Sequence, residues 1–410
     1  MHGITVLRPP TRALRLVAAL ALCVAGVCAC FGSPYGATSE SPPGGDAGVG
    51  EGSVNPEAGS PEGAPTCVDV EADPANCGRC GHSCLGGTCT AGQCQPIELA
   101  SFMDQPTATV VLSATHVFWQ TIEGFASGPG KVYSCPKMGC PGGITTLPVN
   151  GNFIRGLTSD GDQKVYGGAF YANGGLFELG PTTVTQKLDL AQAGSPLQMS
   201  VRPNALFYVA FYDPDGNGRT VREWDYAGNV TKRCVLSSPD NNNTTAAAFT
   251  TSRVYLAGNN TGNLLSCLLI GNGGQFTVHR SNVYLGSIAA TTDRVFWTEN
   301  GSVTSSADGE TSTSLRTELG AADLGGSDAT SVTFSGGDLF VTTAGGELWS
   351  CNPNDCKRTR RKLATAGAVE MFHPFVSHTV AAGAVAVYFV TVDVVAGGGR
   401  GTSHLMKVAR

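Results

Sequence analysis

The residues with the most evident chemistry are the 15 cysteines of this 410-residue chain. Six of them lie within CVDVEADPANCGRCGHSCLGGTCTAGQC (67–94), at the spacing C-x9-C-x2-C-x3-C-x4-C-x4-C. Cysteines this close together can bind zinc, act as a redox centre or form disulfide bonds. The six are Cys67, Cys77, Cys80, Cys84, Cys89 and Cys94.

The spacing favours three disulfide bonds over the two alternatives. A structural zinc site uses paired C-x2-C knuckles or combinations of cysteine and histidine, but only Cys77 and Cys80 form such a pair, and His82 lies between ligands. A redox C-x2-C would stand at a helix start after a strand, and no such pattern surrounds this one. A segment so short has little apolar surface to bury, so cross-links must stabilise it. The pairing is one of fifteen possibilities.

The later cysteines predict further cross-links. Cys135 and Cys140 in SCPKMGC repeat the spacing of Cys351 and Cys356 in SCNPNDC. In both segments C-x4-C follows the same kind of strand, so we expect each pair to join the hairpin that leads to the next strand. Two further cysteines either pair with each other or are buried thiols. These are Cys234 and Cys267.

Other chemistry-bearing patterns are few. The sequence contains no nucleophile elbow, phosphate loop, H-E-x-x-H motif or dinucleotide fingerprint. Asp213, Asp215 and Asn217 in DPDGNG imitate the opening of a calcium loop, but the acid due at position twelve is replaced by Trp224. A hairpin turn explains the same residues, so we expect no metal and keep calcium as the alternative.

Histidines and basic residues near the C-terminal end give no ligand pattern. His373 and His378 are five residues apart, which aligns two ligands on neither a helix nor a strand.

The one basic cluster lacks the interleaved aromatics and wider basic field of a nucleic-acid site, so we expect a solvated surface, with binding of an anionic glycan or phospholipid as the alternative. The cluster is Lys357, Arg358, Arg360, Arg361 and Lys362.

The N-terminal residues have the three parts of a secretory signal. Residues 1–15 carry Arg8, Arg12 and Arg15 and no acid, and an apolar stretch follows. Val27-Cys28-Ala29-Cys30 resembles a bacterial lipobox, in which the cysteine is lipidated and begins the mature protein. We therefore expect 1–29 to be a signal peptide and Cys30 to carry the lipid anchor. An ordinary cleaved signal is the alternative.

Residues 30–66 are predicted to be a disordered tether. They are rich in Gly, Pro, Ser and Glu and cannot bury enough apolar surface to fold. From residue 95 onward the chain has 22 basic and 24 acidic residues, so nothing about its charge recruits nucleic acid.

A regular repeat of strand signals begins after residue 95. Aromatic strand signals such as VFWQT and VFWTEN recur every 41 to 48 residues, and each is followed by further strand signals. A period of this length with several strands per unit is typical of a β-propeller. The inner strands should be the runs of small residues that precede each signal, with Arg155 and Arg202 as polar exceptions. The signals start at residues 117, 165, 206, 254, 295, 339 and 387.

The seven signals predict an all-β fold with a seven-bladed propeller over 95–410, six or eight blades being the alternatives. The seventh unit lacks its outer strand, and the segment Pro96–Ala100 before the first unit matches such strands. We therefore expect this segment to complete the last blade and close the ring. VFWTEN also resembles the YWTD-type repeat of receptor propellers.

The cysteine segment resembles one family. NCGRCGHSC matches an NCGxCGxxC module of bacterial surface lipoproteins, in which it precedes a repeat domain. The resemblance implies an exported, lipid-anchored protein at the outer membrane or cell surface, with a periplasmic or secreted protein as the alternative. We expect a monomeric, non-enzymatic scaffold that binds a protein or glycan, without a cofactor. The alternative is a propeller lyase or hydrolase with its site at the channel mouth.

Overall fold

Short antiparallel strands make up most of the described chain in the computed structural model, because Val, Thr and aromatic residues alternate between Gly-rich turns. All described residues belong to one unit, Ala64–Arg410. They are residue 67 and residues 69–410 without 103–106, 122–130, 150–152, 162, 171–173, 212–218, 237–243, 259–261, 272–273, 282–284, 311–314, 366–380, 384 and 396–398.

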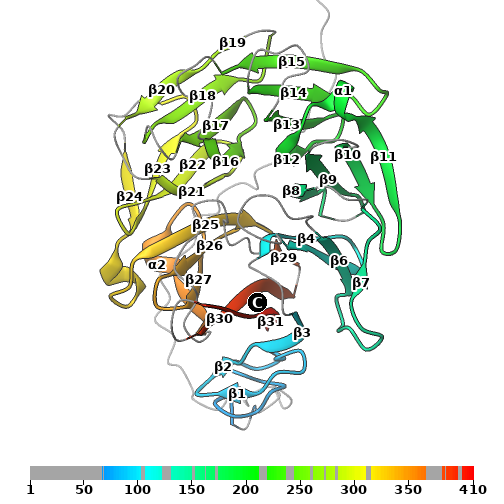
Figure 1. The fold of residues 1–410 in the computed structure, drawn as a ribbon. Coiled ribbons are helices and arrows are strands. Elements are labelled where there is room, and N and C mark those ends of the chain that lie inside the picture. The colour runs from blue at the N-terminus through cyan, green and yellow to red at the C-terminus, as the bar shows by residue number, and fades with distance from the viewer. Residues whose placement is uncertain are drawn as a thin grey trace, which may run out of the picture. The chain divides into compact units, whose positions relative to one another are not determined.

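Seven sheets of the described chain form the blades of a β-propeller (Figure 1), which confirms the predicted fold class. In blades 1 to 6 the four strands pair in chain order, from the inner strand outwards. Blade 1 is β4 (Thr107–Leu112), β5 (His116–Thr121), β6 (Lys131–Pro136) and β7 (Thr145–Thr146); blade 2 is β8 (Phe153–Ser159), β9 (Val165–Phe170), β10 (Gly175–Leu179) and β11 (Val184–Asp189); blade 3 is β12 (Pro196–Val201), β13 (Leu206–Ala210), β14 (Thr220–Trp224) and β15 (Val230–Val235).

The next three blades repeat this plan. Blade 4 is β16 (Thr244–Phe249), β17 (Arg253–Gly258), β18 (Leu264–Leu268) and β20 (Thr277–Arg280); blade 5 is β21 (Leu285–Ala290), β22 (Arg294–Glu299), β23 (Ser302–Ala307) and β24 (Arg316–Leu319); blade 6 is β25 (Ala329–Ser335), β26 (Asp338–Thr343), β27 (Glu347–Cys351) and β28 (Arg361–Thr365). In the described residues the strands are interrupted by the short helices α1 (Leu190–Ala193), η2 (Ala321–Leu324) and α2 (Cys356–Thr359). None of the helices in the described ranges has the length and hydropathy needed to cross a bilayer.

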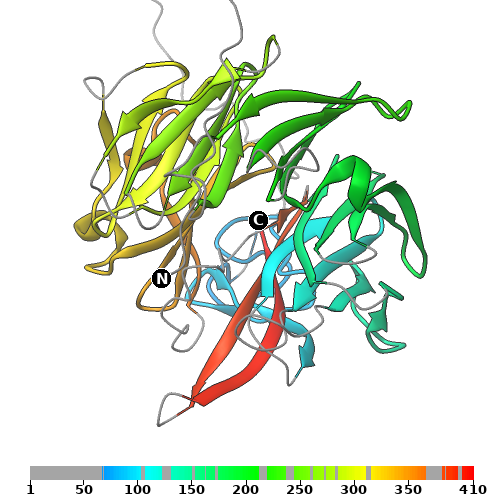
Figure 2. The same cartoon turned by 45° about the horizontal axis from the view of Figure 1, so that its top comes forward.

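Blade 7 closes the ring with strands from both ends of the propeller. Its order is β29 (Ala381–Ala382), β30 (Ala386–Val395), β31 (Gly399–Ala409) and β3 (Ile97–Phe102). The outer strand β3 pairs antiparallel with β31, as the sequence predicts. Figure 2 shows β30 and β31, in red, as a hairpin that extends beyond the blade. The pairing holds the N-terminal strand and the C-terminal hairpin in one sheet, which closes the ring.

An additional short strand ties blade 3 to blade 4. β19 (Gly274–Gln275) leaves blade 4 between β18 and β20 and pairs in parallel with β15, the outer strand of blade 3. There is little room for a side chain at Gly274, because a Cβ atom would lie 3.1 Å from the sulfur of Cys267.

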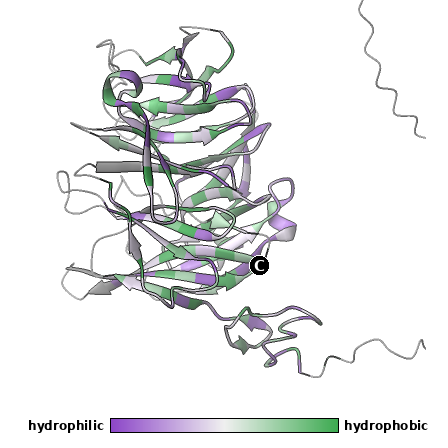
Figure 3. Ribbon diagram, turned by 90° about the vertical axis from the view of Figure 1, so that its right-hand side faces the viewer, coloured by the Kyte–Doolittle hydropathy of each residue, from purple (hydrophilic) through white to green (hydrophobic). Residues whose placement is uncertain are grey.

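Hydrophobic clusters between neighbouring sheets form the core. Trp119, Trp297, Tyr166 and Phe340 are almost completely buried in these clusters. In Figure 3 the hydrophobic segments, in green, run along the strands of the blades. The aromatic repeat signals are therefore the inter-blade core and not a ligand platform.

The cysteine segment lies outside β3 and carries one two-stranded sheet (Figure 1). Its strands are β1 (Cys89–Thr90) and β2 (Gln93–Cys94). The buried cystines share a hydrophobic cluster with Phe340 of blade 6 and with Val387 and Phe389 of blade 7. The segment therefore packs where the last two blades meet.

Candidate functional site

A cavity of about 390 Å³ lies on the axis of the propeller, where the first strands of all seven blades converge. The lining includes Ala246, Ala247 and Ala248 of β16, Ser200 of β12 and Ser335 of β25. Seven strands around one axis leave little room for side chains, so the small residues predicted for the inner strands fit this position.

Blades 2 and 3 approach so closely that their backbones are in contact. A Cβ atom at Gly156 of β8 would lie 1.7 Å from the carbonyl oxygen of Leu197 in β12. A Cβ atom at Gly168 of β9 would lie 2.3 Å from the carbonyl oxygen of Pro196. Glycine at these two positions allows the blades to pack without space for a side chain between them.

Turns between the first and second strands form one rim of the cavity and are linked to one another. The guanidinium of Arg202, after β12, donates to the carbonyl of Thr250 in the next blade and lies over the Phe207 ring. The Thr251 N–H donates to the Thr292 carbonyl at 3.0 Å. These bonds fix the geometry of the rim from blade 3 to blade 5.

Arg202 is one of the two polar exceptions predicted for the inner strands. Its guanidinium donates hydrogen bonds to the main-chain carbonyls of Thr250 and Thr251. Burial lowers its pKa. The other exception, Arg155, lies in β8, and its side chain is outside the described residues. The rim thus holds Arg202 as a structural group that joins two blades.

The lining of the cavity offers hydrogen bonds and apolar contact. Among the described residues it consists of apolar, Gly, Ser and Thr residues and one amide, Gln198. An enzyme site at the channel mouth would need several His, Asp or Glu side chains that converge there. The described lining holds none of these side chains.

A buried serine recurs on the third strand of four blades, and sequence analysis missed it. Ser134, Ser266, Ser305 and Ser350 are each at most 1% exposed. Each is paired in register with an aromatic residue of the second strand. The sequence signal is the serine in KVYSC, LLSCL, VTSSA and ELWSC, which marks equivalent positions of the repeat.

In blade 4 this serine belongs to a buried Ser–His pair. The Ser266 Oγ lies 2.6 Å from His279 Nε2, and His279 Nδ1 lies 2.8 Å from the Glu310 carbonyl of blade 5. Burial lowers the pKa of His279, although the bond to Glu310 opposes this effect. Ser266 has no exposed surface, so the pair joins two blades and is closed to a substrate.

In three of these four blades, the residue directly after the buried serine is a disulfide-bonded cysteine. These cysteines are Cys135 in blade 1, Cys267 in blade 4 and Cys351 in blade 6, and blade 5 has Ser306 at the same position. The structure pairs Cys135 with Cys140 and Cys351 with Cys356, as the repeated spacing predicts. It also pairs Cys267 with Cys234 of β15, so this bond crosses between two blades.

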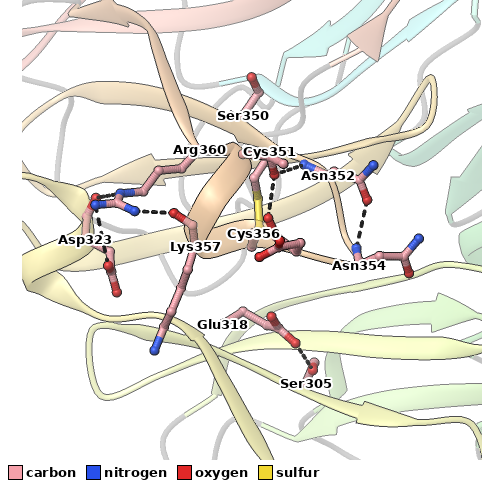
Figure 4. Close-up of a disulfide and its surroundings, with 12 residues drawn as sticks. Ser305, Glu318, Asp323, Ser350, Cys351, Asn352, Asn354, Cys356, Lys357 and Arg360 are labelled. Atoms are coloured by element: carbon pink, nitrogen blue, oxygen red, sulfur yellow. Dashed lines mark hydrogen bonds and ion pairs between the residues drawn. A yellow bond between two sulfur atoms is a disulfide. The ribbon is translucent and has the colours of Figure 1, made fainter. Parts of the chain in front are cut away.

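The basic cluster around α2 serves the packing of blades 5 and 6 (Figure 4). Arg360 donates to the carbonyls of Asp323 and Lys357, and its guanidinium pairs with the Asp323 carboxylate at 3.7 Å. Arg361 Nε donates to Ser350 Oγ at 3.1 Å, and Lys362 pairs with Glu347 at 3.1 Å. Arg358 also forms an exposed pair with Asp355 at 3.7 Å, so four of the five cations are paired with carboxylates.

The six cysteines of the N-terminal segment form three disulfide bonds: Cys67–Cys80, Cys77–Cys89 and Cys84–Cys94. The sulfurs of Cys77, Cys84 and Cys89 lie within 4.8 Å of one another. Because each is bonded to another sulfur, no thiolate is left among them to bind zinc. The segment is thus a disulfide module, as the spacing favours.

Several predicted site residues lie outside the described residues. These are Cys30 with the rest of 1–66, the calcium candidates Asp213, Asp215 and Asn217, and the histidines His373 and His378.

Comparison with known proteins supports the fold. No family model matches the chain, and no curated protein matches it. The fold is similar to that of YCF48 from Cyanidioschyzon merolae, at 10% identity and a TM-score of 0.51, over 77% of this chain and 98% of that one. A structure of YCF48 bound to D1 peptide matches at 12% identity and a TM-score of 0.48, over 77% and 94%. The WD40 propeller domain of Doa1 matches at 12% and 0.45, over 76% and 96%. At such identities the likeness concerns the propeller fold alone.

Proposed function

We propose that this chain is an exported, lipid-anchored β-propeller that binds a protein or glycan at the cell envelope without catalysing a reaction. The observation that carries the proposal is the central cavity, whose described lining offers hydroxyl, amide and apolar groups from seven blades. Such a surface recognises a partner by shape and hydrogen bonding, whereas acid–base or nucleophilic chemistry needs titratable groups.

The disulfide bonds support the part of the proposal that concerns export. All twelve cysteines of the described residues are paired, in six bonds. Disulfides persist in oxidising compartments and are rare where thiols are kept reduced. Together with the signal-like residues 1–29 and the lipobox-like Cys30, they favour an anchored protein outside the cytoplasm.

The rigid rim supports the part of the proposal that concerns binding. Links such as Arg202 to Thr250 and Thr251 to Thr292 hold neighbouring turns in fixed positions. A surface ordered before binding loses less conformational entropy when a partner docks. We therefore place the binding surface at this mouth of the cavity.

Anchoring is tested by fractionation of cells that express the chain or its Cys30→Ala variant. We expect the chain in the membrane fraction with a mass increase at Cys30, and the variant in the soluble envelope fraction. An equal distribution of the two proteins would contradict lipid anchoring.

Binding is tested by crosslinking on intact cells, with the full chain compared with Ser200→Trp, which fills the cavity. The control is Gly142→Trp, because Gly142 lies in the turn of an outer hairpin and a Cβ atom there would meet no other atom within 4 Å. We expect one partner to be recovered with the wild type and the control and lost with Ser200→Trp, at unchanged melting temperature. Equal recovery by all three proteins would place the partner elsewhere. Turnover of a glycan or peptide by the purified chain would contradict the non-enzymatic role.

A further inference from the structure

His404 of β31 lies between two carboxylates in the blade that closes the ring. Its Nδ1 is 2.9 Å from Glu98 Oε2 of β3, and its Nε2 is 3.1 Å from Asp393 Oδ2 of β30. Carboxylates accept hydrogen bonds and do not donate them. Both ring nitrogens must therefore carry a proton, so the arrangement requires an imidazolium.

His82 of the disulfide module meets the same condition. Its Nδ1 lies 2.7 Å from the Cys77 carbonyl of the module, and its Nε2 lies 3.1 Å from the main-chain oxygen of Arg410, directly after β31. Both partners are acceptors only, so both contacts form together when His82 is doubly protonated. One of the two contacts joins the module to blade 7.

The two other histidines of the described ranges do not have this requirement. His279 faces the Glu310 carbonyl and the Ser266 hydroxyl, and a hydroxyl can donate to a neutral ring. His116 Nδ1 lies 2.8 Å from the Thr115 hydroxyl, which can likewise donate or accept. The need for an imidazolium is thus confined to the two histidines where the ring closes.

We propose that this closure seam, defined as β3, β31 and the contact of the module with Arg410, is a pH-dependent latch. Protonated His404 joins the three strands β3, β31 and β30, and the His82 ring joins the module to the end of β31. Loss of the proton from His404 removes one hydrogen bond and the ion pairs at that residue. The latch is independent of the proposed binding function.

The direction of the pH dependence follows from His404. Burial opposes its protonation, but hydrogen bonds to Asp393 and Glu98 outweigh burial, and the pKa of His404 is raised. A raised pKa gives stability that is complete below the unfolded value of about 6.5 and is lost as the pH rises through the folded value. The charged groups that face His404 are Glu98 from β3 and Asp393 from β30.

The charged residues beside His82 do not replace its two bonds. The Arg79 carbonyl accepts from the His82 main-chain N–H at 3.3 Å. The Arg410 guanidinium is paired with Asp338 of blade 6 at 2.9 Å. The contact of the module with blade 7 therefore depends on the His82 ring.

The test compares the full chain with His404→Gln and with the control His116→Gln in thermal unfolding from about pH 5.5 to about pH 8.5, across the range in which histidine titrates. We expect His404→Gln to lower Tm by about 1–2 °C at the acidic end, as for the loss of roughly 1 kcal/mol, and to have little effect at the alkaline end. The control His116→Gln removes an imidazole whose side-chain contact is the Thr115 hydroxyl. A His404→Gln effect that is the same at every pH would overturn the proposal.

Hydrogen exchange and NMR of the wild-type chain provide readouts that do not depend on a variant folding. After correction for the intrinsic exchange rate, amides of β3 should lose protection as the pH rises, while those of β22 keep theirs. The ¹⁵N shifts of His404 should show two protonated ring nitrogens at pH 6. A neutral His404 ring at pH 6, or an equal loss of protection in β22, would overturn the latch.

Discussion

The guanidinium of Arg294 lies 2.7 Å from the carboxylate of Glu318, whose side chain is fully buried. The two residues are on the second and fourth strands of blade 5, β22 and β24. Ser305, on the strand between them, donates to the same carboxylate oxygen at 2.6 Å. In blade 5, the buried serine of the repeat therefore contacts a buried ion pair between the second and fourth strands.

The Arg294→Met variant should destabilise the chain by about 3 kcal/mol, because removal of one partner leaves a buried charge without its pair. The loss should be at the low end of the usual range, since Arg316 remains 3.5 Å from Glu318. Urea unfolding measures the difference. Arg358→Met is the control, because the pair between Arg358 and Asp355 is exposed and is worth less than about 1 kcal/mol. A similar small loss for both variants would contradict the importance of the buried pair.

The disulfide between Cys234 and Cys267 should contribute more stability than the one between Cys135 and Cys140. The first closes a loop with a sequence separation of 33 and the second one of 5. Loop-closure entropy then predicts losses of about 4 and about 2 kcal/mol for the paired Cys→Ala variants. Chemical unfolding of C234A/C267A and C135A/C140A tests the order. The reverse order would show that local packing, and not loop length, decides.

The Gly156→Ala variant should lose about 3 kcal/mol, the upper end of the usual range for overpacking, because its methyl group has no space beside the carbonyl of Leu197 and blades 2 and 3 must move apart. Gly142→Ala is the matched control, since a Cβ atom there meets nothing within 4 Å. Differential scanning calorimetry should show a lower Tm for the first variant and an unchanged Tm for the second. Equal Tm values would mean that the two blades can separate at little cost.

His279 should give a pH dependence opposite to that of His404. Burial lowers the pKa of His279, so its contribution to stability is present above the unfolded value of about 6.5 and is lost as the pH falls through the folded value. The variant His279→Gln should therefore be destabilised less, relative to the wild type, at pH 5 than at pH 8. Urea unfolding at the two pH values measures this difference. A larger loss at pH 5 would contradict the assignment of a neutral, buried ring.

The architecture was predictable from the sequence because each unit of the repeat carries a local pattern of strand-forming residues. Aromatic strands every 41 to 48 residues indicate a propeller, and the β-like segment at Pro96–Ala100 indicates the strand that completes blade 7. The structure confirms both features, with Ile97–Phe102 as β3. The C-x4-C spacing was also sufficient for Cys135 and Cys351, because both partners lie in one hairpin.

The site was less predictable because its features depend on neighbours that are distant in the chain. The serines Ser134, Ser266, Ser305 and Ser350 carry a repeat signal that could have been found, but their burial could not. Lys357, Arg358, Arg360 and Arg361 are exposed, as the solvated-surface prediction expects. Their partners could not be read from the sequence, because Arg360 and Arg361 contact groups supplied by other elements.

The sequence by itself indicated seven blades, the closing strand and the need for cross-links in residues 67–94, because these follow from periodicity, strand propensity and the small apolar content of that segment. Only the tertiary structure decided between seven blades and the alternatives of six or eight, which sulfurs pair in that segment and which groups His404 contacts. Glu98 and His404 are 306 residues apart in the chain. The register of β3 on β31 places them in contact, and no local pattern encodes a contact that depends on ring closure.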